Sequence, residues 1–160
     1  MSRIIKASVN DTDIVFDITQ KTIRTVYPHF YPAGAVEFFS QHHSIGNVMR
    51  DIEAGCVWLL MDDEGVAAGT VTINDNEINR LFVLPEYQGK GYGKALMDFA
   101  EDLISKNYCS AELSSSLSAK QIYLKRGYTE ISYNMIDSPG GDKLCYDYMV
   151  KEFDSKGGTE

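Results

Sequence analysis

A loop with three glycines, set between two segments of different type, constrains this chain more than any other feature. Residues 78–83 are rich in strand formers, and residues 95–104 repeat apolar side chains at helical spacing. Gly89, Gly91 and Gly93 lie between these segments. Glycine lets an anion approach the backbone, and a helix N-terminus presents unpaired N–H groups and the positive end of the helix dipole. The loop is therefore predicted to bind a phosphate or a pyrophosphate.

Two common phosphate-binding motifs do not match this loop. A P-loop requires Ser or Thr directly after Gly-Lys, whereas Gly91 and Ala95 follow the two Gly-Lys pairs here. In a dinucleotide-binding loop the third glycine would fall on Lys94 or Leu96, depending on the frame. The chain also has too few alternating strands and helices for a doubly wound sheet. Both motifs are excluded.

The remaining pattern is Gln-x-x-Gly-x-Gly, formed by Gln88, Gly91 and Gly93. It resembles the coenzyme A pyrophosphate loop of the GNAT superfamily of N-acetyltransferases. The resemblance implies that the donor is acetyl-CoA and that the N–H groups of the loop hold its pyrophosphate.

A second segment, residues 116–128, is similar to the other signature of that family, Asn-x-x-Ala-x-x-x-Tyr-x-x-x-Gly-Phe. The positions that match in type and spacing are Ala119, Tyr123 and Gly127, whereas Ser116 and Tyr128 replace the usual Asn and Phe. Two motifs in the family's order are stronger support than either motif alone.

Periodicity and turn residues predict the element order β-α-α-β-β-β-α-β-α-β-β. The expected strands are residues 3–7, 56–61, 66–73, 78–83, 108–113, 128–136 and 143–151. The expected helices are residues 14–27, 32–55, 95–104 and 118–126, with a break in the second at 44–47. Ser118 and Gln121 have the spacing of a capping box at the start of the last helix. This is the element order of the GNAT fold. The resemblance therefore implies an α/β (α+β) fold with a mixed, mostly antiparallel sheet of about seven strands and helices on both faces.

Bulk properties predict one cytoplasmic domain over residues 1–153, followed by a polar tail over residues 154–160. No apolar run approaches ~20 residues, and no signal-peptide pattern is present. The net charge of −8 argues against nucleic-acid and membrane partners, because anionic phosphates favour clustered Lys and Arg. Cys56, Cys109 and Cys145 are expected to be reduced thiols in the core.

The resemblance assigns cofactor contacts to three segments. The strand end before the loop would pair with the pantetheine arm, with the Val83 N–H positioned to stabilise the thioester carbonyl oxygen. Ser116 would contact the pantetheine in place of the family's Asn. The expected acetyl-CoA ligands are Leu81, Phe82, Val83, Gln88, Gly89, Lys90, Gly91, Tyr92, Gly93, Lys94, Ser116, Ala119 and Tyr123. Lys125 and Arg126 are weaker candidates for the phosphates than Lys90 and Lys94.

Two residues are candidates for proton transfer. Tyr123 would give a proton to the leaving sulfur, since a phenol is protonated at neutral pH. Glu77 would accept the amine proton, directly or through water, and it lies where some GNAT members carry a catalytic glutamate. The other reading of each residue is structural, a core tyrosine and an exposed carboxylate.

His29, His42 and His43 fall in the region that lines the acceptor site in the family. A histidine base is one interpretation, and surface histidines packed on aromatic rings are the other. Their spacing does not predict a metal site.

The resulting hypothesis is an N-acetyltransferase that moves the acetyl group of acetyl-CoA to a primary amine by direct attack in a ternary complex. The alternative is a non-catalytic CoA-binding sensor or interaction module. A covalent acyl-cysteine enzyme is disfavoured, because no cysteine near the loop has an activating partner. The acceptor, a small-molecule or peptide amine, is not identified by any motif, and family habit suggests a homodimer.

Overall fold

The computed structural model describes residues 2–154. The strands are β1 (Arg3–Lys6), β2 (Val57–Met61), β3 (Ala67–Asn74), β4 (Glu77–Val83), β5 (Ser110–Ser115), β6 (Thr129–Asp137) and β7 (Lys143–Glu152). The helices are α1 (Thr12–Val26), α2 (Ala33–His42), α3 (Ile45–Glu53), α4 (Tyr92–Ser105) and α5 (Lys120–Lys125), with short 3-10 turns η1 (Val9–Asp11), η2 (Tyr27–His29), η3 (Pro85–Tyr87) and η4 (Pro139–Gly141).

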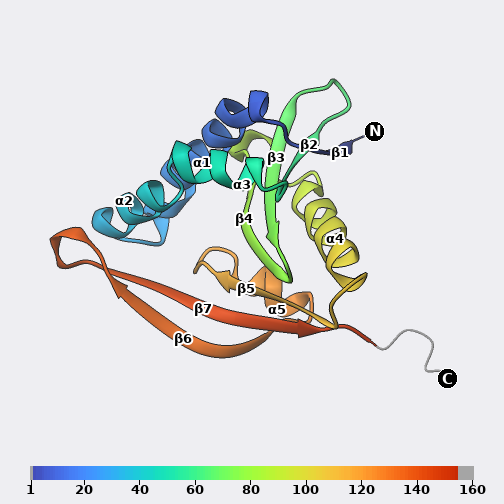
Figure 1. Ribbon diagram of the computed structural model, residues 1–160. Helices are drawn as coiled ribbons and strands as arrows, with labels where there is room; N and C mark the ends of the chain where they lie inside the picture. Colours follow the sequence, from blue (N-terminus) through green and yellow to red (C-terminus); the bar gives the residue numbers. More distant parts are fainter. Residues whose placement is uncertain (1, 155–160) are drawn as a thin grey trace.

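The strands form one sheet in the order β1-β2-β3-β4-β5-β7-β6 (Figure 1). Every neighbouring pair is antiparallel except β4 and β5, which run parallel. The long β6–β7 hairpin reaches across to α2. The predicted GNAT-type sheet of mostly antiparallel strands is confirmed.

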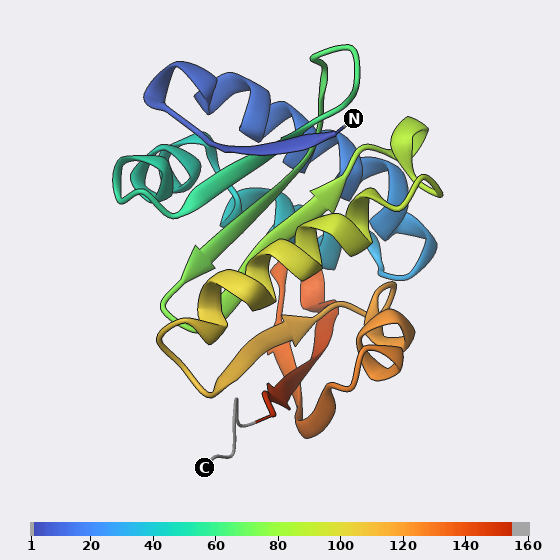
Figure 2. The ribbon, with the colours of Figure 1, turned by 90° about the vertical axis from the view of Figure 1, so that its right-hand side faces the viewer.

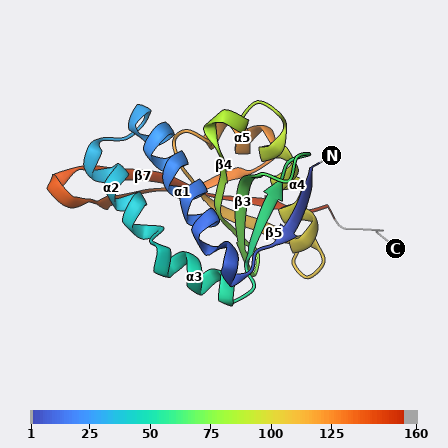
Figure 3. The ribbon, with the colours of Figure 1, turned by 90° about the horizontal axis from the view of Figure 1, so that it is seen from above.

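Helices cover both faces of the sheet. Figure 3 shows α1, α2 and α3 on one side of β3 and β4, with α4 on the other, and Figure 2 shows α4 crossing in front of the sheet. The first face buries Val15, Ile23 and Val48, and the second buries Leu96 and Ile104, each at most 2% exposed. The sheet therefore separates two apolar cores, which stabilise the positions of the strands between them.

The predicted element order is confirmed, with small shifts at the ends. The second helical region divides into α2 and α3, because Ser44 caps a new helix by accepting a hydrogen bond from the Asn47 N–H at 3.3 Å. The capping box predicted at Ser118 is wrong. Its hydroxyl pairs with the Ser116 hydroxyl at 2.9 Å, and α5 begins after Ala119 without a side-chain cap.

The expectation of three core cysteines is also wrong. All three are free thiols, but Cys109 is exposed and Cys56 and Cys145 are only half-buried. Cys109 precedes β5 at the end of a turn, where an apolar sequence neighbourhood does not ensure burial. The described part of the predicted polar tail is Asp154; residues 155–160 lie outside the described residues.

The two parallel strands separate soon after they begin to pair. β4 and β5 share only two register pairs, Glu77 with Glu112 and Ile78 with Leu113. Beyond them β4 continues beside β3 alone, with a bulge in its register opposite Thr70 to Thr72. This separation opens the sheet in the middle of the molecule, between the segment that carries the glycine loop and the segment that carries residues 116–128.

Candidate active site

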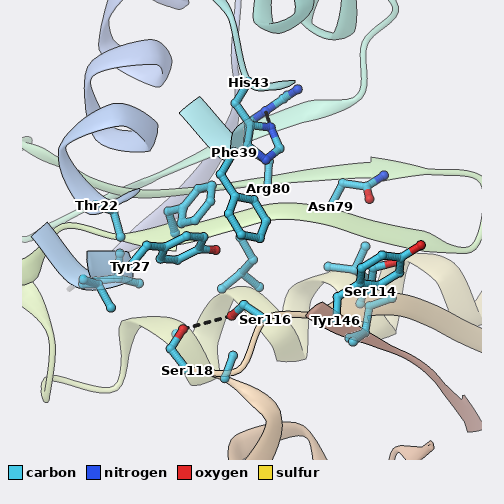
Figure 4. A pocket seen from close by; sticks show the side chains of 18 of the residues that line it. Thr22, Tyr27, Phe39, His43, Asn79, Arg80, Ser114, Ser116, Ser118 and Tyr146 are labelled. Atoms are coloured by element: carbon cyan, nitrogen blue, oxygen red, sulfur yellow. Dashed lines mark hydrogen bonds between the residues drawn. The ribbon is translucent and has the colours of Figure 1, made fainter. Parts of the chain in front are cut away.

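A cavity of about 870 Å³ lies where β4 and β5 separate. Its walls come from α1 to α3, from β4 and the glycine loop, and from the β5–α5 segment, and Figure 4 shows side chains from these elements facing one another. The cavity is lined by most of the predicted site residues, namely Glu77, Leu81, Phe82, Val83, Gln88, Gly89, Gly91, Tyr92, Gly93, Ser116, Ala119 and Tyr123. The fold therefore brings the two sequence motifs to one space.

The glycine loop forms an open backbone surface at one end of the cavity. Gly89 and Gly91 adopt left-handed conformations with φ of 81° and 84°, and Gly91 is the N-cap of α4. A Cβ atom built on Gly89, Gly91 or Gly93 would meet no atom within 4 Å. The loop therefore leaves open space around its glycines, as an anion site at the N-terminus of α4 would require.

The end of β4 offers its backbone to the cavity. The Leu84 N–H donates to the Ala68 carbonyl at 2.9 Å, and Phe82 is in register with Thr70. Because hydrogen-bonding directions alternate along a strand, the Val83 N–H points away from β3, toward the opening. The Gln88 side-chain amide donates to the Val83 carbonyl at 3.1 Å, which fixes the loop against this strand end.

The β5–α5 segment supplies hydroxyl groups on the opposite wall. Ser116 and Ser118 are hydrogen-bonded to each other, and the Tyr27 ring extends toward them from across the cavity (Figure 4). The Tyr123 ring packs edge-to-face on Tyr128, with 5.7 Å between ring centroids. Burial raises the pKa of Tyr123 to about 12, so its hydroxyl is protonated throughout the neutral range.

Glu77 lies at the base of the cavity, where β4 and β5 still pair. It is half-buried, and its Oε1 accepts a hydrogen bond from the Asn79 side-chain amide at 3.1 Å. This contact fixes one carboxylate oxygen, while the residue still lines the cavity. Glu77 and Val83 are the two ends of β4, so at about 3.3 Å per residue a chain of waters would have to link this carboxylate to an amine at Val83.

Comparison with known proteins decides the family. The family model described as an acetyltransferase (GNAT) domain matches residues 26–138. This chain belongs to the GNAT acetyltransferase domain family. No curated relative matches the sequence. The structure is similar to that of a GCN5-related N-acetyltransferase from Rhodopseudomonas palustris, with a TM-score of 0.86 and 19% identity over 96% of both chains.

Two other GNAT-fold structures were solved with a ligand. The PaiA N-acetyltransferase from Thermoplasma acidophilum, in complex with coenzyme A, has a TM-score of 0.70 and 20% identity over 96% of this chain and 99% of that one. YncA from Salmonella typhimurium, with its cofactor acetyl-CoA, has a TM-score of 0.72 and 16% identity over 100% of this chain and 98% of that one. At these identities the likeness shows the fold.

The basic residues near the loop of this GNAT domain are placed less favourably than expected. Lys90 and Lys94 do not line the cavity. Lys90 lies over the Tyr87 ring, 5.6 Å from its centroid, and Lys94 forms an ion pair with Asp98 at 2.8 Å. Both ammonium groups would have to leave these contacts to meet a phosphate.

Arg126 is held still more firmly. It bonds to Glu101 through Nε at 3.2 Å and through NH2 at 3.0 Å, and NH2 also pairs with Asp98 at 2.9 Å. Glu101 also binds Lys151 and the Tyr128 hydroxyl. Arg126 therefore ties the end of α5 to α4 and β7 and makes a poor phosphate ligand in this arrangement.

The three histidines have different environments. His29 is exposed and does not line the cavity, whereas His42 is exposed at its edge and stacks on Phe38, with 6.1 Å between ring centroids. His43 is half-buried, and its Nδ1 accepts a hydrogen bond from Arg80 Nε at 3.2 Å. Only His43 combines burial with a fixed polar partner in the cavity wall.

Sequence reasoning missed Arg80. It lies at the bulge of β4 with φ of 46°, its side chain is 5% exposed, and its NH2 pairs with Asp51 at 2.9 Å. The available signal was the single charged residue in the predicted strand of residues 78–83, since a buried charge requires partners.

No helix among the described residues is long and apolar enough to cross a membrane. Across residues 2–154, no three His, Cys, Asp or Glu side chains are grouped so as to hold a metal ion.

Proposed function

We propose that this protein is an N-acetyltransferase that moves the acetyl group of acetyl-CoA to a primary amine by direct attack in a ternary complex. The observation that carries the proposal is the meeting of three features in one cavity: the open glycine loop, the unpaired edge of β4 and the hydroxyl-bearing β5–α5 segment. Acetyl-CoA would enter from the loop side and the amine from the side of α1 to α3.

The donor site fits a pyrophosphate followed by an extended amide-containing arm. The N–H groups at the start of α4 would hold the phosphates, since Gly91 and Gly93 leave their surroundings open. The pantetheine arm would pair with the free edge of residues 81–83 as an added strand, and Ser116 would offer it one hydroxyl donor. Lys90 and Lys94 would add charge only after leaving their present partners.

The reaction can be assigned to three groups on the cavity wall. The amine nitrogen attacks the thioester carbon, a C–N bond forms, and the oxygen gains charge that the Val83 N–H would stabilise. Glu77, through water, would take the proton that the nitrogen loses. The C–S bond then breaks, and Tyr123 would give its proton to the sulfur. Because its pKa is about 12, Tyr123 is a weak acid, and its proton is expected to move as charge develops on sulfur.

The donor site is tested by Gly91→Glu and isothermal titration calorimetry with acetyl-CoA. A glutamate at the N-cap of α4 would put a negative charge where the pyrophosphate is proposed, so binding should fall by at least about 100-fold. Gly65→Glu is the matched control, because Gly65 has a similar φ of 82° and open space around it in the distant β2–β3 turn. Unchanged affinity in Gly91→Glu would show that the loop is not the phosphate site.

Catalysis is tested by free-thiol release from acetyl-CoA with a panel of polyamines, aminoglycosides, amino acids and peptides, and mass spectrometry of the acetylated product. Transfer to nitrogen with thiol release supports the proposal. Tight acetyl-CoA binding without thiol release for any amine would favour a non-catalytic CoA-binding module instead.

We further infer that the acceptor is a small-molecule or peptide amine and that the protein works in the cytoplasm without a nucleic-acid or membrane partner. The net charge of −8 supports this inference, because it disfavours polyanionic partners and suits a cationic amine. A homodimer is proposed by analogy with the family, and analytical ultracentrifugation would measure the oligomeric state.

A further inference from the structure

A histidine–arginine pair in the cavity wall has no part in the chemistry proposed above. His43 follows α2, and Arg80 lies at the bulge of β4. Each nitrogen of the Arg80 guanidinium has a partner: Nε donates to His43 Nδ1 at 3.2 Å, NH1 donates to the Thr72 hydroxyl at 3.0 Å, and NH2 pairs with Asp51 at 2.9 Å. These three contacts on different elements give the guanidinium one orientation.

This contact defines the tautomer of His43. A guanidinium can only donate hydrogen bonds, so His43 Nδ1 must be the acceptor and the ring proton must be on Nε2. Burial, the charge of Arg80 and the neighbouring His42 lower the pKa of His43 to about 3. The imidazole is therefore neutral at physiological pH, and it is unsuited to accept a proton from an ammonium group.

The protonated nitrogen faces the cavity. In Figure 4 the His43 ring is joined to Arg80 on one side and turns its other nitrogen toward the interior, above Phe39 and Tyr27. The ring also packs edge-to-face on Phe82, with 5.9 Å between centroids. Phe82 directly precedes Val83, whose N–H is proposed to hold the thioester oxygen. His43 and Val83 therefore line the same cavity, with the Phe82 ring between the imidazole and the strand end.

We propose that His43 is a specificity-determining residue of the acceptor site, whose Nε2–H binds an oxygen on the acceptor, and that Arg80 is the positioning residue that fixes it. The inference rests on the proposed function. Because His43 and Val83 line one cavity and an imidazole N–H binds an oxygen acceptor, we assign the oxygen to a carbonyl or carboxylate group on the carbon that bears the amine. Alkylamines and polyamines without such an oxygen would leave this half-buried donor without an acceptor on the substrate, which disfavours their binding.

Two amines that differ by one group test the proposal. L-Phenylalaninamide carries a carboxamide that 2-phenylethylamine lacks, and their shared aromatic ring suits the wall formed by Tyr27 and Phe39. Wild type should prefer the amide by roughly tenfold or more in kcat/KM, the size of about one hydrogen bond. His43→Phe retains an aromatic ring and should lose that preference, whereas the same change at the exposed His29 should not.

The outcomes separate this inference from the proposed function. Acetylation of both amines at equal kcat/KM, or an undiminished preference in His43→Phe, would overturn the inference and leave N-acetyl transfer intact. L-Phenylalanine as a third substrate distinguishes a carboxylate from a neutral carbonyl oxygen, because only the carboxylate would form a charge-assisted hydrogen bond with the His43 N–H.

A second measurement does not depend on turnover. Long-range ¹H–¹⁵N NMR spectra of the imidazoles should show His43 protonated at Nε2 only, with no titration between about pH 5 and pH 8. L-Phenylalaninamide with CoA should shift the Nε2 proton, and 2-phenylethylamine with CoA should not. In Arg80→Lys a single ammonium cannot replace three contacts, so the imidazole should lose its fixed orientation, the shift of the Nε2 proton with the amide should shrink, and the substrate preference should fall. A wild-type His43 that is protonated at Nδ1, or that shows no shift with the amide, contradicts the proposal.

Discussion

Burial acts on Tyr123 and His43 in opposite directions, and in both cases it fixes the neutral form. A phenol loses a proton to become charged and an imidazole gains one, so the same apolar surroundings raise one pKa and lower the other. At neutral pH Tyr123 then carries one O–H donor and His43 carries one N–H donor. At the scale of the residue, the cavity is therefore lined by two neutral donors, one on the side of each proposed substrate.

Tyr123→Phe tests the donor on the CoA side. Removal of the hydroxyl should lower kcat by about 100-fold, in the range of general acid catalysis, and should leave the KM for acetyl-CoA nearly unchanged. Because its pKa is about 12, wild-type kcat should show no basic limb from this group up to about pH 10. Tyr108→Phe, on the surface, is the control. A Tyr123→Phe enzyme with normal kcat would remove Tyr123 from the mechanism.

His43 also makes stability depend on pH. Its pKa is about 3 in the folded protein and 6.5 as an ordinary value, so the unfolded chain binds more protons between these two pH values. Stability is therefore complete above about pH 6.5 and is lost as the pH falls, with a slope approaching 1.4 kcal/mol per pH unit.

Urea unfolding of wild type and His43→Phe checks this dependence. Between pH 7 and pH 5 the wild type should lose about 2 kcal/mol more than the variant. His29→Phe should behave like the wild type, because His29 is exposed. Equal losses in wild type and His43→Phe would mean that His43 is protonated in the folded protein.

At the scale of elements, Tyr31 connects two walls of the site, the helical wall of α1 and α2 and the wall formed by the β5–α5 segment. Its hydroxyl accepts a hydrogen bond from the Leu117 N–H at 2.8 Å and donates to the Cys145 carbonyl at 2.9 Å. The segment between α1 and α2 is thereby tied to the β5–α5 segment and to β7. On the hairpin side, the Asp142 carboxylate accepts from the Gly34 N–H at the start of α2.

Tyr31→Phe should affect both stability and donor binding. Two part-buried hydrogen bonds to backbone groups would be lost, which predicts a loss of about 1–2 kcal/mol in the free energy of unfolding. The KM for acetyl-CoA should rise more than kcat falls, since Leu117 adjoins Ser116. Chemical denaturation and steady-state kinetics measure both effects, with Tyr108→Phe again as the control. Wild-type stability in Tyr31→Phe would show that the tie contributes little.

The elements themselves follow closely from the sequence, because periodicity and turn chemistry act locally. The break before α3 is predicted from the segment around Ser44, and the glycine loop is found at its expected place before α4. The bulge at Arg80 is not predicted, because it depends on the register between β3 and β4. The ion pair of Lys94 with Asp98 has i,i+4 spacing on a helix, so the sequence could have predicted that Lys94 is paired.

At the scale of the whole molecule, the separation of β4 from β5 leaves a sheet with an unpaired edge in its middle. Backbone groups at such an edge are open to exchange with solvent unless a ligand covers them. The two apolar cores lie on either side of this opening and are packed independently of it. Ligand binding should therefore change protection locally while it stabilises the folded state as a whole.

Hydrogen exchange with saturating acetyl-CoA tests this division. Amides of residues 81–83 and 88–94 should exchange more slowly in the complex, whereas those of β1 and β2, remote from the opening, should change little. At about 100 times its Kd the ligand should also add about 2.7 kcal/mol to the free energy of unfolding. At the same ligand concentration both effects should be much smaller in Gly91→Glu. Protection that appears in the β6–β7 hairpin and not in residues 81–83 would place the donor outside the opening, because only a ligand paired with β4 covers its free N–H groups.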